Sequence, residues 1–160
     1  MKRIVVHTPG GPGQMVLEDG PAPVPGPADV VIDVVAAGVN FIDVYFRSGQ
    51  YKAEVPLTLG SEAAGTVSAV GADVRDLKPG DRVAYAMVRG AYTEQVVVPA
   101  AMVVRVPDAV PLETAAAAML QGMTAHYLTR STFPLEAGQT CLVHAAAGGA
   151  GGLIVQMARR

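Results

Sequence analysis

The chain has 160 residues, a formal net charge of −2 at pH 7, and 16% charged residues against 51% hydrophobic ones. With no basic run longer than the two final arginines, it has no electrostatic footprint for binding nucleic acid. The single cysteine, Cys141, excludes an internal disulfide and a metal site built from several thiolates. The three histidines are scattered without the spacing of metal ligands, so we expect no bound metal.

The sequence shows neither a membrane segment nor a secretion signal. The apolar run 115–120 is far shorter than the roughly 20 residues that cross a bilayer. The charged start, Lys2 and Arg3, is followed by a short apolar stretch that ends at His7, so the hydrophobic region of a signal peptide is missing. We therefore expect a cytoplasmic protein with no membrane partner.

The first part of the chain predicts short strands separated by turn-forming residues, the rhythm of a β-sandwich or barrel. Residues 21–27 are rich in proline, cannot form a helix and serve as an extended connector. Residues 78–81 have the composition of a turn. The strand candidates are residues 2–7, 29–37, 65–71, 82–85, 92–98 and 102–106.

The pattern changes at Pro111. From there apolar residues recur at steps of three and four, which predicts an amphipathic helix with Pro111 in its first turn. Gly122 within this pattern predicts a kink or a division into two helices. Residues 139–145 are apolar without alternation, which predicts a strand covered on both faces, with Cys141 in the core. A glycine-rich loop follows, and then another helix that contains Leu153.

The loop after this predicted strand fits a dinucleotide-binding fingerprint. Ala146, Gly148 and Gly151 match the pattern A-x-G-x-x-G between a strand and a helix. In that motif the middle glycine lets the backbone approach a pyrophosphate, and the last lets the helix pack on the strand. The alternative is an ordinary turn. The residue about 20 positions further on, which distinguishes NAD from NADP, would lie past residue 160.

Five segments of the chain resemble one known family. They are spread in family order over the whole sequence: AGVNFID at 37–43, GSEAAG at 60–65, KPGDRV at 78–83, QGMTA at 121–125 and VHAAAGGAG at 143–151. They are similar to the medium-chain dehydrogenase/reductase superfamily, specifically its zinc-free quinone oxidoreductase (zeta-crystallin-like) branch. The resemblance implies an α/β protein. A GroES-like β-rich catalytic domain would span residues 1–115, and residues 116–160 would hold connector helices and the first β–α unit of a Rossmann domain.

The resemblance also implies a function. Members of this branch transfer hydride from NADPH to a quinone or another electron-poor small molecule without a metal, and NADH stays open as an alternative. Zinc-containing members carry Cys where Asn40 stands and His where Ser61 stands, and neither Asn nor Ser is a good zinc ligand. We expect a homodimer for the complete protein.

The candidate catalytic residues are Asn40, Tyr45 and Tyr51, whose neutral donors could stabilise the oxyanion that develops on the quinone. The resemblance places Asn40 and Thr124 near the nicotinamide ribose and ring, and the two tyrosines in the quinone pocket. The cofactor loop residues are Ala146, Gly148, Gly149, Ala150 and Gly151. A purely structural alternative stays open, in which Asn40 caps a helical turn and both tyrosines are packing residues. Asp43 and Arg47 are expected to form a local pair.

Two further functional alternatives stay open. The first is an enoyl-thioester or alkenal reductase, which shares the scaffold and the cofactor. The second is a GroES-like binding module without turnover. For the 160-residue chain itself we expect a folded β domain without quinone reductase activity, because residues 139–145 need neighbouring strands.

Overall fold

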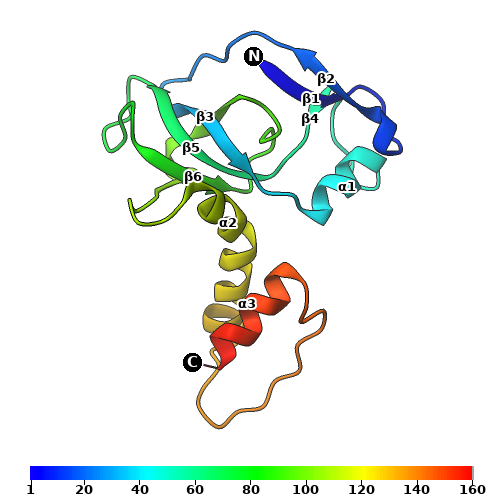
Figure 1. The fold of residues 1–160 in the computed structure, drawn as a ribbon, viewed down its shortest axis with the longest axis vertical. Helices are drawn as coiled ribbons and strands as arrows, with labels where there is room; N and C mark the ends of the chain where they lie inside the picture. Colours follow the sequence, from blue (N-terminus) through cyan, green and yellow to red (C-terminus); the bar gives the residue numbers. More distant parts are fainter. Residues whose placement is uncertain (160) are drawn as a thin grey trace. The chain divides into compact units, whose positions relative to one another are not determined.

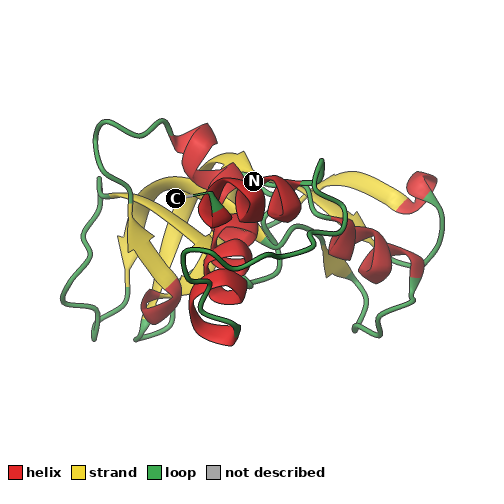
Figure 2. Ribbon diagram, turned by 90° about the horizontal axis from the view of Figure 1, so that it is seen from below, coloured by secondary structure: helices red, strands yellow, loops and turns green. Residues whose placement is uncertain are grey.

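The computed structural model describes residues 1–159, and the chain divides into two compact units, Met1–Ala117 and Ala118–Arg160. Figure 1 colours the elements along the chain and Figure 2 colours them by type. They are β1 (Lys2–Val6), η1 (Pro12–Gln14), β2 (Met15–Asp19), β3 (Asp29–Ala37), α1 (Phe41–Ser48), β4 (Leu57–Thr58), β5 (Glu62–Val70), β6 (Arg82–Ala86), β7 (Gln95–Pro99), η2 (Ala100–Met102), β8 (Val103–Arg105), α2 (Leu112–His126), η3 (Tyr127–Thr132) and α3 (Gly149–Ala158).

The first unit is built from two antiparallel sheets. The larger has the strand order β7–β3–β5–β6–β8, and the smaller has the order β2–β1–β4. The long strands β3 and β5 pair along their lengths, with Ile32 opposite Val67. Phe46 of α1 packs against Val6 and Leu57, so α1 lies against the smaller sheet (Figure 1).

One hydrophobic cluster of the first unit lies on one face of the larger sheet, and every second residue of a strand points to that face. Val30 and Ile32 of β3, for example, are fully buried. The remaining members of this cluster are Ala63, Val67, Val83, Tyr85, Ala91, Val96 and Val98. The other face also buries residues, such as Val31 and Ala64.

All six strands expected from the sequence are present in the first unit, and β5 begins three residues earlier than expected, at Glu62 instead of residue 65. The sequence did not reveal β2 and β4. Four of the five residues of β2 are exposed, so the strand buries no face and carries no apolar alternation that could have indicated it. β2 forms because its backbone pairs with β1 from Met15 to Asp19.

Of the two outcomes predicted at Gly122 in the second unit, a kink or a division into two helices, the division is wrong. The helix α2 continues through Gly122 to His126 and is followed directly by the π-helical η3. A glycine in a helix interior costs only about 1 kcal/mol relative to alanine, which the neighbouring turns of a long helix can carry.

The predicted strand 139–145 is also wrong, since the described part of the second unit contains no strand. Its side chains are not covered: Leu142 is 84% exposed and Cys141, expected in the core, is exposed. A strand needs partners for its backbone N–H and C=O groups and cover for its apolar faces, and residues 118–159 supply neither. Helix α3 begins at Gly149, inside the glycine-rich loop. No helix within residues 1–159 is long and apolar enough to span a bilayer.

The buried face of β3 generates a stability prediction. Replacing Ile32, which is fully buried, by alanine should lower the free energy of unfolding of the first unit by about 2–5 kcal/mol, because the substitution removes buried methylene groups and leaves a cavity. The matched control is Val24→Ala at a side chain that is 84% exposed, which should change stability by less than about 0.5 kcal/mol. Urea denaturation followed by circular dichroism measures both. Equal effects of the two substitutions would contradict the assigned core.

Candidate active site

Helix α1 begins where β3 has ended, and Asn40 is its N-cap in an extended conformation. The Asp43 carboxylate lies in the first turn and accepts a hydrogen bond from the backbone N–H of Asn40 at 3.1 Å. A negative charge at this end of a helix also interacts favourably with the helix dipole. Gly49, in the left-handed region with φ of 81°, ends the helix. Asn40 thus caps α1, as the structural alternative for this residue predicted.

Asp43 is the hub of a buried polar network. Its side chain is only 5% exposed. Besides the Asn40 N–H, it accepts hydrogen bonds from the Ser61 hydroxyl at 2.9 Å and from the Tyr92 hydroxyl at 2.8 Å. Burying a carboxylate is costly unless donors replace its water, and these three groups do so. The network ties the first turn of α1 to the start of β5 and to the loop before β7.

The predicted pairing of Asp43 with Arg47 is wrong. The carboxylate points toward Ser61 and Tyr92, which occupy its acceptor positions. The Arg47 guanidinium instead donates from Nε to the backbone carbonyl of Gly10 at 3.2 Å. Because the interior side of α1 carries the donors that a buried carboxylate needs, the helix-surface pair does not form.

A second buried carboxylate, Glu62, orients the Asn40 amide. Glu62 is fully buried at the first position of β5, and its Oε1 accepts a hydrogen bond from Asn40 Nδ2 at 2.7 Å. Gly38 makes room for this carboxylate, since a Cβ at that position would overlap the Glu62 side chain. A side-chain amide has two N–H donors, so Asn40 retains a second one beside the donor that Glu62 holds.

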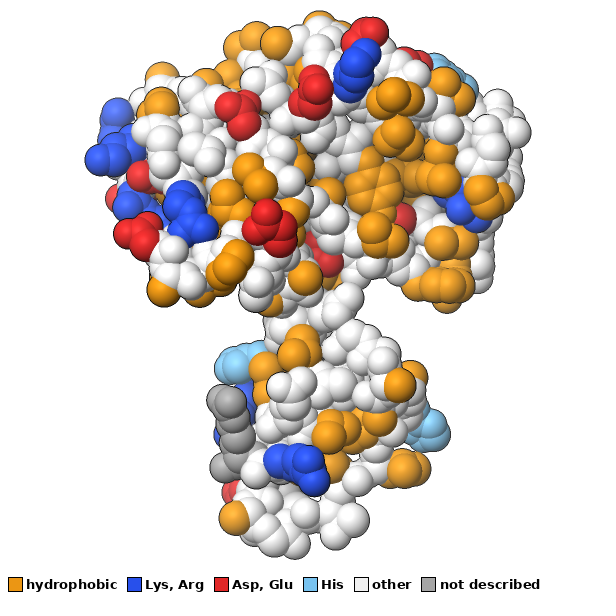
Figure 3. All heavy atoms as spheres, viewed as in Figure 1, with side chains coloured by type: hydrophobic (Ala, Val, Ile, Leu, Met, Phe, Trp, Pro, Cys, Tyr) orange, Lys and Arg blue, Asp and Glu red, His pale blue; other side chains and the backbone are white. Residues whose placement is uncertain are grey.

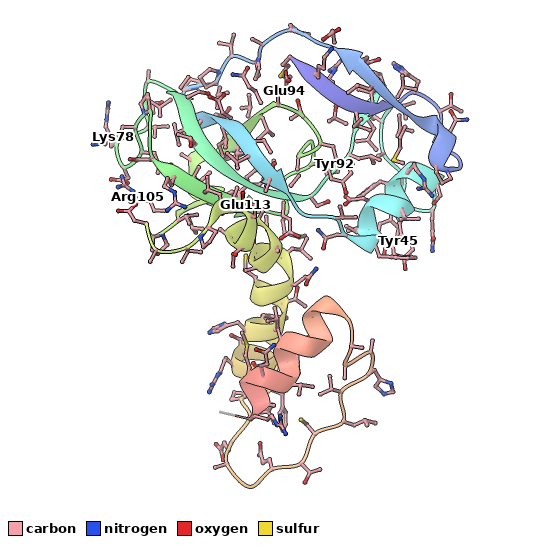
Figure 4. The ribbon with its side chains drawn as sticks, viewed as in Figure 1. Tyr45, Lys78, Tyr92, Glu94, Arg105 and Glu113 are labelled. Carbon is pink, nitrogen blue, oxygen red and sulfur yellow. The ribbon has the colours of Figure 1, made fainter. Side chains whose placement is uncertain are left out.

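The two candidate tyrosines lie together on the same side of the first unit. Tyr51 packs against Tyr45 at 5.1 Å between ring centroids and edge-on against Phe46 at 5.7 Å. Within residues 1–159 neither tyrosine hydroxyl has a hydrogen-bond partner. Figure 3 shows apolar side chains gathered at this end of the unit, where Figure 4 labels Tyr45.

Tyr92 and Tyr85 are held in their neutral forms. Burial, and then the hydrogen bond to Asp43, raise the pKa of Tyr92 well above its ordinary value. Burial alone raises the pKa of Tyr85, whose hydroxyl is buried without a partner among the described residues. Tyr92 therefore keeps its proton at neutral pH and donates a hydrogen bond to the Asp43 carboxylate.

Met87 borders this network in an unusual backbone conformation. Its φ is 69°, in the left-handed region that non-glycine residues rarely adopt. Its N–H donates to the Ser61 carbonyl at 2.8 Å, and its side chain is 64% exposed. Strained residues of this kind often lie at functional sites, where surrounding contacts hold them in place.

The second unit contains the glycine loop and the start of α3. Gly148 is the N-cap in an extended conformation, and Gly148 and Gly149 are exposed. Gly151 is buried, and a Cβ there would overlap the carbonyl oxygen of Ala145 and lie 2.8 Å from its carbonyl carbon. Only glycine allows α3 to approach the loop this closely. The Gly148 N–H donates to the Ala145 carbonyl at 2.8 Å, so a phosphate group would be bound by the N–H groups of the first turn that follows.

The other cofactor candidates also lie in the second unit. Ala146 is in the loop, and Ala150 is the second residue of α3. Thr124 lies on α2, where its hydroxyl donates to the Leu120 carbonyl at 2.7 Å and keeps its lone pairs for an incoming donor. Asn40 belongs to the first unit and Thr124 to the second.

Asn40 and Ser61 stand where zinc-containing members carry Cys and His. Their side chains donate hydrogen bonds to the carboxylates of Glu62 and Asp43, respectively. Within residues 1–159 no group of three or more His, Cys, Asp and Glu side chains could hold a metal ion. The chemistry of this donor set is that of neutral hydrogen-bond donors.

Residues 26–108 match the alcohol dehydrogenase GroES-like domain family, so the chain belongs to that family. The relatives place it in the quinone oxidoreductase branch, which confirms the resemblance. A quinone oxidoreductase of Pseudomonas aeruginosa is 48% identical over 160 residues, covering 99% of this chain and 49% of that protein. A 2-haloacrylate reductase of a Burkholderia species is 40% identical, covering 97% of this chain and 49% of that protein.

Solved structures agree with this assignment. The Escherichia coli quinone oxidoreductase complexed with NADPH superposes with a TM-score of 0.97 at 40% identity, over 99% of this chain and 49% of that one. The expected fold class, a GroES-like β-rich domain in an α/β protein, is thereby confirmed. The chain spans about half the length of the curated relatives it matches.

Sequence reasoning named Asn40, Tyr45 and Tyr51 as candidates but did not identify the residues that hold Asn40. Asp43, Glu62 and Tyr92 form the buried network around it. A signal for Glu62 was available, because a carboxylate within the otherwise small and apolar segment 60–65 must be buried with a partner. Tyr92 carried no comparable signal, since its contact with Asp43 joins residues 49 positions apart.

The raised pKa of Tyr92 generates a prediction for alkaline pH. Unfolded tyrosine ionises near pH 10, whereas folded Tyr92 stays protonated. The folded state therefore binds more protons than the unfolded state above about pH 10, and stability falls as the pH rises. Tyr92→Phe should flatten this decline, measured by urea denaturation between about pH 8 and pH 11. Tyr127→Phe, at a side chain that is 59% exposed, is the control and should leave the slope unchanged. A slope that is unchanged in Tyr92→Phe would contradict the burial of this hydroxyl.

The left-handed conformation of Met87 generates a second prediction. Met87→Gly should be more stable than Met87→Ala by about 1 kcal/mol, because glycine adopts a positive φ without steric cost. Comparing the two variants removes the effect of losing the methionine side chain. Thermal unfolding of both variants measures the difference, and an alanine variant at least as stable as the glycine variant would show that Met87 is unstrained.

Proposed function

We propose that this chain provides the catalytic domain, and the start of the dinucleotide-binding domain, of an NADPH-dependent quinone oxidoreductase that works without a metal. The observation that carries the proposal is the Asn40 amide, held by the buried Glu62 carboxylate at 2.7 Å beside the Ser61–Asp43 pair. Neutral donors stand there in a rigid, preorganised arrangement. The similarity to quinone oxidoreductases over nearly the whole chain supports the same function.

The bound nicotinamide would supply the hydride. As the hydride adds to the quinone, negative charge develops on a quinone oxygen, and donors already aimed at it lower the barrier. The second N–H of Asn40 is one such donor, and Tyr45 and Tyr51 offer hydroxyls that no described residue occupies. A quinone is already electron-poor, so hydrogen bonds of this kind suffice where a simple ketone would call for a Lewis acid.

The glycine loop would hold the pyrophosphate. Gly148 and Gly149 expose their backbone at the N-terminus of α3, and Gly151 allows the helix to pack closely on Ala145. The E. coli enzyme of the matched structure binds NADPH, which favours NADPH over NADH for this chain. Thr124 and Asn40 would contact the nicotinamide end of the cofactor, and the complete protein would be a homodimer.

A second candidate function is the reduction of an activated alkene. One relative, 40% identical over 97% of the chain, is a 2-haloacrylate reductase. The same donors could stabilise the enolate formed when hydride adds to an alkene beside a carbonyl group. Comparing rates with a quinone and with 2-chloroacrylate decides between the two acceptor classes.

Activity should depend on completing the second unit. A chimera that joins residues 1–160 to the C-terminal half of the P. aeruginosa relative should reduce 1,4-benzoquinone with NADPH. The 160-residue chain alone should show no measurable turnover, because the described part of the second unit contains no strand to support the glycine loop. Steady-state NADPH oxidation measures both proteins. An inactive but folded chimera, or a fully active 160-residue chain, would contradict the proposal.

Gly151 should be essential for binding the dinucleotide. Gly151→Val in the chimera should raise the Kd for NADPH by more than about tenfold, because a side chain there meets the Ala145 backbone. Gly122→Ala is the control: it also replaces a helical glycine of the second unit, but a Cβ there has open space and Gly122 has no positive φ. Isothermal titration calorimetry measures the affinities. An unchanged Kd in a folded Gly151→Val variant would leave the loop as an ordinary turn.

A further inference from the structure

A pocket of about 230 Å³ opens beside α1 in the first unit. It is lined by Ile42, Phe46, Lys52, Ser61, Met87 and Arg89. At ~30 Å³ per water molecule this is the room of roughly eight waters, close to the size of a single-ring molecule with one substituent. Ser61 belongs to the network that holds Asn40, so the pocket adjoins the proposed catalytic donors.

The lining carries positive charge without a matching negative charge. Lys52 and Arg89 are both exposed to solvent, and neither forms an ion pair with any residue in the range 1–159. Arg89 lies over the ring of Phe46, with Cζ 4.8 Å from the ring centroid, which holds its guanidinium at the wall of the pocket. No carboxylate is among the lining residues.

Asp43 and Glu62, the buried carboxylates around Asn40, are not among the residues that line the pocket. Asp43 lies behind Ser61, is 5% exposed, and accepts three hydrogen bonds from neutral donors. Glu62 is fully buried and accepts the Asn40 amide. The Ser61 hydroxyl uses its one hydrogen to donate a hydrogen bond to Asp43, so toward the pocket it can only accept hydrogen bonds. Lys52 and Arg89 are therefore the charged donors available to a ligand in this pocket.

We propose that this pocket selects acceptors that carry a carboxylate group, with Lys52 and Arg89 as the residues that determine this specificity. The inference rests on the proposed function and specifies its substrate class. The apolar side chains of Ile42, Phe46 and Met87 would contact the ring or alkene of the acceptor. The carboxylate would lie between the ammonium and guanidinium groups, where charge-assisted hydrogen bonds are strong. Such an arrangement orients the acceptor by its anionic end and leaves its reducible end toward the Asn40 side.

The test uses two inert probes of nearly equal shape, benzoate and benzamide, titrated into the 160-residue chain and followed by two-dimensional NMR. Benzoate should bind about tenfold more tightly than benzamide, with shifts at the lining residues. The double variant Lys52→Gln/Arg89→Gln should remove this preference by weakening benzoate while leaving benzamide unchanged. Raising the salt concentration should weaken the binding of benzoate only.

Two variants serve as controls. Lys78→Gln removes a surface lysine at the opposite end of the first unit from Tyr45, as Figure 4 shows, and should leave both affinities unchanged. Arg89→Lys retains the charge and should retain most of the benzoate preference, which keeps the test decisive if the double variant fails to fold. Equal affinities for the two probes, no saturable binding of either, or a benzoate preference that survives loss of both cations would overturn the inference.

The assay contains no dinucleotide and no turnover, so its failure is distinct from failure of the proposed function. If benzoate shows no preference while the chimera reduces 1,4-benzoquinone, the pocket inference falls and the quinone oxidoreductase proposal stands. If benzoate binds as expected and the chimera is inactive, the carboxylate site stands as a binding site and the proposed reaction falls.

Discussion

Two buried carboxylates, Asp43 and Glu62, determine the geometry of the candidate site. Each would be costly to bury alone, and the cost falls only if hydrogen-bond donors are held against it. The fold meets this need by bringing three separate segments together: the first turn of α1, the start of β5 and the loop before β7. Losing one donor would leave a buried acceptor partly unsatisfied, so the network constrains all three segments at once.

This constraint explains how neutral side chains are held in fixed orientations at the candidate site. An asparagine on a free loop would sample several orientations, whereas Asn40 is fixed as a helix N-cap and by Glu62. A donor fixed before the reaction needs no reorganisation when charge develops on the acceptor, which is the main physical source of electrostatic catalysis. The network also depends on Gly38, whose missing side chain leaves space for Glu62, and on the hydrogen bond that the Ser61 hydroxyl donates to Asp43. The exposed cations Lys52 and Arg89 lie outside it and remain available to a ligand.

Much of the fold was readable from the sequence because local patterns determine it. The β-branched run of β3, the alternation within residues 65–71 and the three- and four-residue steps of α2 indicated these elements. The strand β2 was not predicted because it buries no face and so has no apolar alternation. Residues 139–145 were wrongly predicted as a strand because an apolar run forms a strand only when neighbouring strands pair with it. In the site, Asn40 came from a motif, and the two tyrosines were proposed from the family resemblance. Their supports Glu62 and Tyr92 depend on contacts between distant parts of the chain, which a local pattern cannot encode.

The central claim is that fixed neutral donors around Asn40, rather than a metal ion, stabilise the reacting quinone. The most direct test is the single-turnover rate of NADPH oxidation by 1,4-benzoquinone in the chimera, measured by stopped flow before and after dialysis against a chelator. We expect the rate to survive chelation and to fall about 100-fold in Asn40→Ala. A rate that is lost on chelation and restored by zinc, or one that is unchanged in Asn40→Ala, would contradict it.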